Sequence, residues 1–183
     1  MTVRVINAQS ALPIDVAAID RVARCAIKRL RIRTPGKLTI TCLGPRRMRT
    51  LNKRFLRHDW ATDVLSFRYD GEVTDLPRHA WRRRVIGDIM VAPAQARAYA
   101  RAHGIPYEEE LLRYVIHGLL HWLGHEDHTA RQQRTMRAME DQLLLRCGVN
   151  RRPIGNRGPR RLKRKNRLSP RLPVPGYQSR PSK

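Results

Sequence analysis

The stretch EEELLRYVIHGLLHWLGHEDH, residues 108–128, contains two histidines, His117 and His121, four positions apart. Its leucine, isoleucine and valine residues recur at helical spacing, which predicts a helix that is buried on nearly all sides. Four residues advance a helix by about one turn, so both imidazoles point in the same direction. Two imidazole nitrogens on a rigid helix are a common basis for a transition-metal site.

The bend after this helix offers a third ligand. Gly124 follows the last apolar residue and is expected to cap the helix. The sequence HEDH, residues 125–128, comes next, and each of its side chains is a potential metal ligand. Three protein ligands with an open position are typical of catalytic zinc, whereas four ligands are typical of structural zinc.

The residue after the first histidine separates this motif from that of the zinc proteases. In H-E-x-x-H the glutamate is the general base of a metalloprotease. Position 118 is glycine here, so that base is missing. Gly118 is also expected to leave space and bare backbone beside the metal.

Three segments together resemble one known family. HGLLHWLGHEDH, residues 117–128, is similar to the H-G-x-L-H-x-x-G-x-D-H signature of the YbeY-type endoribonucleases, the rRNA maturation factors of bacteria. LNKRFLRHDWATDVLSF, residues 51–67, and IGDIMVAPAQARAYA, residues 86–100, are similar to two further motifs of that family. The resemblance covers residues 1–148. It implies a zinc-dependent, single-strand-specific endoribonuclease that matures the 3′ end of small-subunit rRNA and acts in ribosome quality control.

The resemblance also implies roles for individual residues. His117 and His121 are expected to hold one zinc ion together with Asp127 or His128. Ungapped spacing favours Asp127, which stands where the family has its third histidine; a one-residue insertion would present His128 instead. As catalytic residues we expect His117, which acts through the metal, and Arg54 and Arg57.

The two arginines are expected to neutralise the phosphate of the RNA. They are both candidates because the family's frequent arginine is replaced by Leu56 in this sequence.

Four further polar residues have two possible roles each. Thr62, Asp63 and Ser66 are expected either to line the cleft or to hold a turn. Asp88 is expected either to orient a histidine by a hydrogen bond or to serve in a turn.

Composition limits the class of partner. The chain has 183 residues with a formal net charge of +23, which favours a nucleic-acid partner, here rRNA and the ribosome, over a membrane. We find no long apolar run and expect a cytoplasmic protein without a membrane span, a secretory signal or a small-molecule cofactor. Cys25, Cys42 and Cys147 have no C-x-x-C spacing, so we expect reduced core residues rather than disulfides.

The order of the predicted elements indicates an α+β fold, an α/β sandwich. We expect strands at residues 3–7, 37–43, 64–67 and 85–91, with helices at 15–30, 45–55, 93–103, 107–123 and 130–147. A small mixed sheet of about four strands would then pack against helices, with the metal site on a helix and its following turn.

We expect two parts in the chain. Residues 1–150 form the metal-dependent endoribonuclease domain. Residues 151–183 carry 12 Lys or Arg, 6 Pro and no Asp or Glu, and are expected to form a basic, Pro-rich disordered tail.

Two other functions compete with the nuclease. One is an RNA-binding or ribosome-binding assembly factor with a structural zinc. The other is a metalloprotease-like hydrolase, which the glycine at position 118 and the basic charge disfavour.

Overall fold

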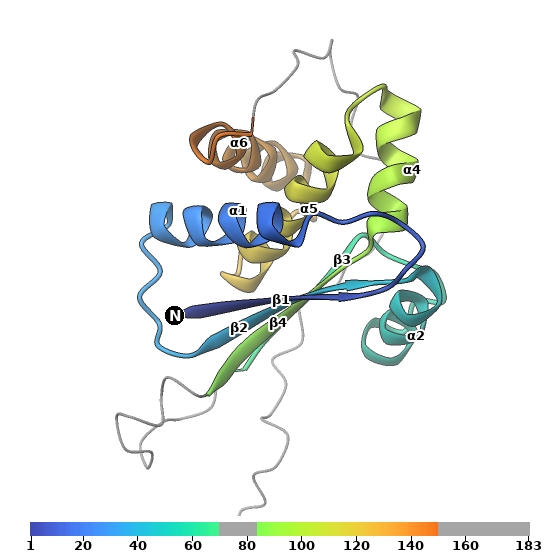
Figure 1. Ribbon diagram of the computed structural model, residues 1–183, viewed down its shortest axis with the longest axis horizontal. Helices are drawn as coiled ribbons and strands as arrows, with labels where there is room; N and C mark the ends of the chain where they lie inside the picture. Colours follow the sequence, from blue (N-terminus) through green and yellow to red (C-terminus); the bar gives the residue numbers. More distant parts are fainter. Residues whose placement is uncertain (70–83, 150–183) are drawn as a thin grey trace, which may run out of the picture.

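A four-stranded mixed sheet lies at the centre of the computed structural model, which describes residues 1–69 and 84–149 (Figure 1). The strands are β1 (Thr2–Ala8), β2 (Lys37–Leu43), β3 (Val64–Arg68) and β4 (Val85–Val91), in the spatial order β1-β2-β4-β3. β1, β2 and β4 run parallel, and β3 pairs with β4 antiparallel. The predicted α+β class and small mixed sheet are confirmed.

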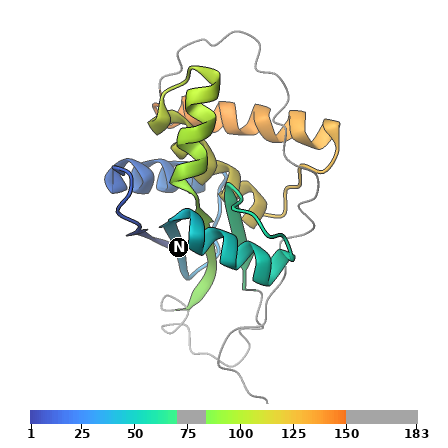
Figure 2. The same cartoon turned by 90° about the vertical axis from the view of Figure 1, so that its right-hand side faces the viewer.

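The helices of the described residues cover both faces of the sheet. They are α1 (Val16–Arg29), α2 (Pro45–Leu56), α4 (Pro93–His103), α5 (Tyr107–Trp122) and α6 (Ala130–Arg146). The main core joins the sheet to α1, α5 and α6, and a smaller core joins Met48 of α2 to Leu65 and Phe67 of β3. α2 therefore lies across the sheet from the helix that carries the histidines (Figure 2).

Local sequence signals set the helix ends. The Asp15 carboxylate accepts a hydrogen bond from the Ala18 backbone N–H at 2.8 Å, which caps α1. Pro45 and Pro93 begin α2 and α4, where a missing N–H costs nothing. Thr129 and Gln132 form a reciprocal capping box at the start of α6. The predicted helices are therefore found close to their expected bounds.

α5 packs unusually close to the sheet. A Cβ atom at Gly118 would lie 2.5 Å from Ile89 Cγ2 and 2.7 Å from Val64 Cγ1. The expectation that Gly118 leaves space beside the metal is wrong, because the glycine is needed where α5 meets β3 and β4. This close packing fixes the position of His117, the preceding residue, relative to the sheet.

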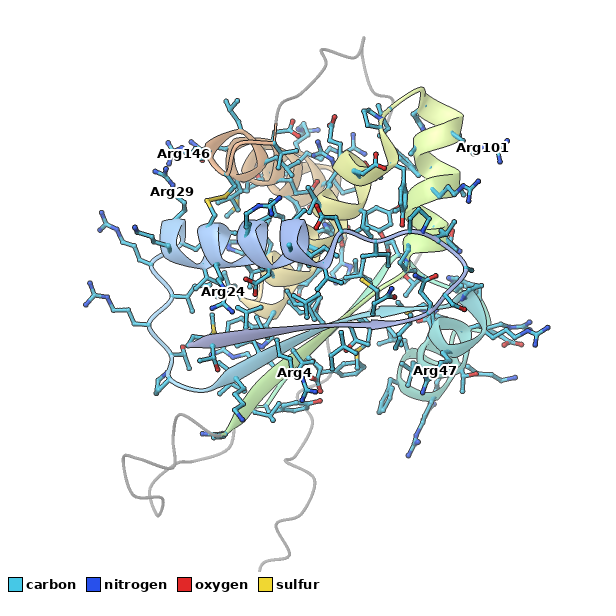
Figure 3. All side chains as sticks on the ribbon, in the orientation of Figure 1. Arg4, Arg24, Arg29, Arg47, Arg101 and Arg146 are labelled. Carbon is cyan, nitrogen blue, oxygen red and sulfur yellow. A yellow bond between two sulfur atoms is a disulfide. The ribbon has the colours of Figure 1, made fainter. Side chains whose placement is uncertain are left out.

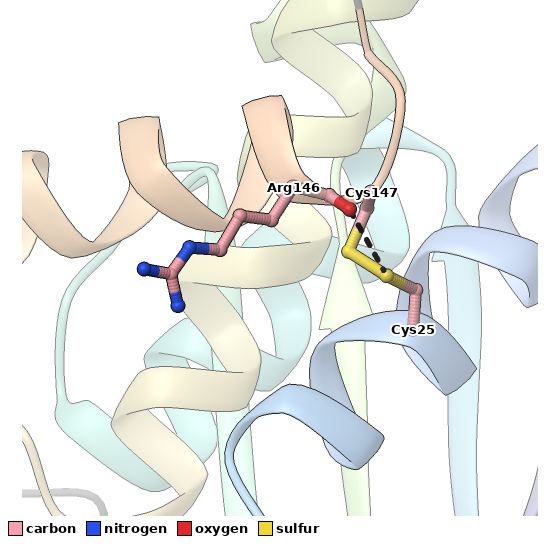
Figure 4. The surroundings of a disulfide bond; sticks show 3 residues. All are labelled: Cys25, Arg146 and Cys147. Carbon is pink, nitrogen blue, oxygen red and sulfur yellow. Dashed lines mark hydrogen bonds between the residues drawn. A yellow bond between two sulfur atoms is a disulfide. The ribbon is translucent and has the colours of Figure 1, made fainter.

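The structure corrects the expected state of two cysteines. Cys25 of α1 and Cys147 at the end of α6 form a disulfide, with their Cα atoms 5.7 Å apart (Figure 4). The prediction failed because α6 packs back against α1, which brings together residues separated by 122 positions. Cys42 remains a free, buried thiol, as expected.

Positive charge is spread widely over the described surface. Labelled arginines extend from α1, α2, α4 and α6 in different directions (Figure 3). No described helix has the length and apolar character that crossing a bilayer requires. Residues 70–83, between β3 and β4, and residues 150–183, which include the predicted tail, are outside the described residues.

Candidate metal centre

α5 brings the rings of His117 and His121 together. Their Nε2 atoms lie 3.0 Å apart, and the ring planes are almost perpendicular at 86°. His117 is buried, and the side chain of His121 is 14% exposed. The spacing of four residues thus has the predicted result, with both imidazoles on one side of the helix.

The end of α5 turns the chain back towards these rings. Gly124 adopts a φ of 94°, and its N–H donates to the His121 carbonyl at 2.9 Å. The His125 N–H donates to the Leu120 carbonyl at 3.0 Å, which completes a Schellman motif. The His125 carbonyl then accepts a hydrogen bond from His121 Nδ1 at 2.9 Å. One glycine therefore ends the helix and orients the second imidazole.

Asp127 is the third member of the group. It is buried, with Oδ2 3.9 Å from His117 Nε2 and Oδ1 3.8 Å from His121 Nε2. The three residues offer ligand atoms that all lie within 4.8 Å of one another, so they could hold a metal ion. His128 is outside this group, and its Nε2 lies 3.2 Å from the Glu126 carboxylate. The arrangement favours Asp127 as the third ligand, which stays a prediction.

Buried charges fix the other nitrogen of His117. Nδ1 lies 2.7 Å from Glu140 Oε1 on α6, and Oε2 of the same carboxylate accepts from Arg113 Nη1 at 3.2 Å. Arg113 also donates to Asp141 at 2.6 Å. A carboxylate behind a histidine orients the ring and strengthens it as a metal ligand.

The hydrogen bonds determine which nitrogens are free to ligate. A carboxylate and a carbonyl can only accept, so Nδ1 of each histidine carries the proton. A neutral ring presents a lone pair at Nε2, so the two Nε2 atoms, which lie 3.0 Å apart, are both available as metal ligands. Burial, reinforced by the neighbouring His117, lowers the pKa of His121 to about 4, which keeps this ring neutral. This donor set fits a divalent metal ion.

Sequence reasoning missed Glu140. It assigned a possible histidine-orienting role to Asp88, whose carboxylate instead accepts from the Tyr69 hydroxyl at 2.6 Å. A signal for Glu140 was present, since it follows Met136 by four residues and precedes Leu143 by three, within the buried stripe of α6. A charged residue in such a stripe requires a buried partner.

The segment before β3 lies close to the metal group. Asp63 Oδ1 accepts from the Thr62 hydroxyl at 2.9 Å and from the Val64 N–H at 3.0 Å, so both residues hold a turn. The negative charge of Asp63 also raises the pKa of His121 against the larger effect of burial. The Ser66 hydroxyl donates to the Gly118 carbonyl at 2.8 Å and ties β3 to α5.

Arg54 and Arg57 lie at the end of α2, and both are exposed. Arg57 caps the helix with a φ of 58°, and the Arg54 guanidinium lies 5.5 Å from the centre of the Phe55 ring. Neither has a contact with the metal group among the described residues. Their role at the phosphate stays a prediction.

Comparison with known proteins assigns the family. A family model described as endoribonuclease YbeY matches residues 4–148. The chain is 32% identical over 145 residues to the endoribonuclease YbeY of Bifidobacterium animalis, with 79% of each chain covered. It is 31% identical over 169 residues to that of Acidothermus cellulolyticus, which covers 88% of this chain and all of the relative.

Two further matches are more limited. A match of 38% identity to the Myxococcus xanthus protein covers 62% of this chain and 37% of the relative. The solution structure of TM1509 from Thermotoga maritima has the same fold, with a TM-score of 0.52 at 19% identity over 80% of this chain and 89% of that one. From the match over residues 4–148 and the two relatives covered over most of their length, the chain belongs to the endoribonuclease YbeY family.

Proposed function

We propose that this chain hydrolyses phosphodiester bonds of single-stranded RNA with one zinc ion held by His117, His121 and Asp127. As a member of the endoribonuclease YbeY family, the chain is a metal-dependent endoribonuclease of rRNA processing. The observation that carries the zinc proposal is the pair of Nε2 atoms facing each other at 3.0 Å beside a buried carboxylate.

Each residue has a defined part in this proposal. A bound zinc ion would supply Lewis-acid chemistry for a water molecule and a phosphoryl oxygen. His117 and His121 would hold it with neutral nitrogens, and Asp127 would supply negative charge. Three protein ligands leave a position open for the reactants. Arg54 and Arg57 would neutralise phosphate charge along the RNA.

The wider setting follows from the charge of the chain. A net charge of +23 suits a partner with a dense phosphate backbone. We infer that the substrate is the 3′ end of small-subunit rRNA, that the chain associates with the ribosome and acts in its quality control, and that it works in the cytoplasm.

Residues 151–183 belong to the same proposal, as a basic tail after a domain of residues 1–150. The tail carries 12 of the 38 Lys and Arg residues and would bind phosphates without reading sequence. Deletion of residues 151–183 should weaken RNA binding and flatten its dependence on salt, measured by titration at several salt concentrations. Unchanged affinity at moderate salt would remove the tail from the proposal.

A cleavage assay separates the nuclease from an assembly factor with a structural zinc. Wild type, His117→Ala and His121→Ala would each be incubated with single-stranded RNA, and RNA binding would be measured in parallel. We expect only the wild type to cleave while binding persists in all three. If the wild type cleaves no faster than the variants, the assembly factor is correct. Casein in the same assay tests the metalloprotease alternative.

Metal analysis identifies the ion and its third ligand. Protein purified without a metal-chelating tag should contain about one zinc per chain, measured by atomic emission. Asp127→Ala should lose the metal and His128→Ala should retain it. The reverse pattern would make His128 the ligand.

A further inference from the structure

The loop between α2 and β3 carries a stacked aromatic pair, of which Trp60 is exposed. The rings of His58 and Trp60 lie 4.5 Å apart with an angle of 11° between their planes. Trp60 is 41% exposed, although most large apolar side chains in residues 1–69 and 84–149 are buried or partly buried. An exposed tryptophan in a fixed orientation offers a flat apolar surface for a ligand.

Several contacts hold this loop in place. The buried Asn52 side chain donates to the Trp60 carbonyl at 2.7 Å. Arg49 of α2 binds both carboxylate oxygens of Asp59 at 2.9 and 3.0 Å, and Lys53 adds a contact at 3.4 Å. The Arg49 hydrogen bond lowers the pKa of Asp59 to about 2, so the ion pair between the two residues persists at neutral pH. These contacts involve the backbone and Asp59, so they do not depend on the indole ring.

The loop also carries positive charge and leads to the metal group. Arg57 is exposed and has no charged partner among the described residues. Trp60 precedes Asp63 by three residues, so their Cα atoms are at most about 11 Å apart. Val64, the residue after Asp63, packs where α5 approaches the sheet at Gly118, one residue after His117. Figure 2 shows this loop running from α2 to the start of β3.

We propose that Trp60 is a stacking platform for a base of the single-stranded RNA, close to the bond that is cut. Every base has an aromatic face, so stacking on tryptophan tolerates any sequence. Bases in a duplex are already stacked and are not free to splay onto a protein ring, so the platform selects single strands. Arg57 contacts the phosphate beside the stacked base. The proposal rests on the proposed function, because it assumes an RNA substrate.

Binding measured without metal tests the platform separately from cleavage. A fluorescent single-stranded oligoribonucleotide would be titrated with wild type, Trp60→Ala and Trp60→Phe in a chelator. We expect Trp60→Ala to weaken binding about tenfold and Trp60→Phe to restore most of it, since stacking is lost in the first variant and kept in the second. Leu145→Ala removes another exposed apolar side chain and should bind like wild type.

Salt dependence distinguishes stacking from charge. Trp60→Ala should leave the slope of log affinity against log salt unchanged, whereas Arg57→Gln should reduce that slope by about one. Binding to a duplex of the same sequence, and to an oligonucleotide with abasic sites, should be insensitive to Trp60→Ala. Equal binding of single strands by wild type and Trp60→Ala would overturn the proposal, as would a Trp60→Leu variant as good as Trp60→Phe.

The outcomes also separate this proposal from the proposed function. If neither the wild type nor any variant cleaves RNA but Trp60→Ala still weakens RNA binding, the stacking proposal stands and the nuclease mechanism fails. If wild type and Trp60→Ala cleave and bind single strands equally, the nuclease stands and the platform fails. If Trp60→Ala loses association with purified ribosomes but binds free RNA normally, the tryptophan contacts protein and the proposal is wrong.

Discussion

At the scale of single residues, the group of His117, His121 and Asp127 depends on a carboxylate outside the group. Glu140 orients His117 from a different helix and is held by Arg113. Asp141 accepts a hydrogen bond from the same arginine at 2.6 Å, but its side chain is partly exposed. The two neighbouring carboxylates therefore allow the effect on the ligand to be separated from the effect on the arginine.

We expect Glu140→Gln to weaken zinc binding by about 10- to 100-fold, because the loss of the carboxylate charge makes His117 a poorer ligand. Asp141→Asn is the matched control and should change zinc affinity little. Zinc affinity would be measured by competition with a chromophoric chelator, well below the unfolding temperature of each variant. Equal affinities in the two variants would show that Glu140 serves stability alone.

The residues also show where sequence reasoning reached its limit. The pair His117 and His121 was predictable, because helical spacing fixes the direction of both rings. The preference for Asp127 over His128 depended on ungapped spacing alone, because both are acceptable zinc ligands and the path of the bend decides between them. Glu140 belongs to a helix 23 residues further on, so only the packing of α6 against α5 could assign its partner.

At the scale of elements, Gly118 allows α5 to pack closely against the sheet. Gly118→Ala would place a Cβ against Val64 and Ile89. Alanine favours a helix by up to about 1 kcal/mol over glycine, but overpacking costs about 1–3 kcal/mol. We therefore expect Gly118→Ala to lower the free energy of unfolding, measured by urea titration. The same change should shift His117 away from the sheet.

A double-mutant cycle identifies the cause of that loss. Val64→Ala removes Cγ1, which lies 2.7 Å from the position of the new Cβ, so Gly118→Ala should cost less in this background. Additive free energies of unfolding would show that the clash with Val64 is not the reason. An increase in stability from Gly118→Ala alone would contradict the close packing itself.

Elements were more predictable than their arrangement. Asp15, Pro45, Pro93 and Thr129 mark helix starts through local chemistry, and the four helices lie close to their expected bounds. The order β1-β2-β4-β3 depends on which strands meet across the sheet, which no local signal specifies. The prediction of reduced cysteines failed for the same reason, because the disulfide joins the two ends of the domain.

At the scale of the whole molecule, the three cysteines should differ sharply in reactivity. Burial raises the pKa of Cys42 to about 11, so at pH 8 it is a neutral thiol shielded from reagents. We expect no reactive thiol in the native oxidised protein, one after unfolding, and three after unfolding with a reductant, counted with a chromogenic thiol reagent. Two or more reactive thiols before reduction would show that Cys25 and Cys147 are not linked.

The link between Cys25 and Cys147 closes nearly the whole domain into one loop. A cross-link over 122 residues removes much conformational freedom from the unfolded chain and should stabilise the fold by about 2–4 kcal/mol. Reduction should therefore lower the free energy of unfolding of the wild type, measured by urea titration with and without reductant. The double variant Cys25→Ala with Cys147→Ala should match the reduced wild type and respond to reductant no further. Equal stability of the oxidised and the reduced wild type would show that α6 is held by packing alone. Because α6 carries Glu140, zinc affinity measured on the oxidised and the reduced protein tells whether the disulfide also supports His117.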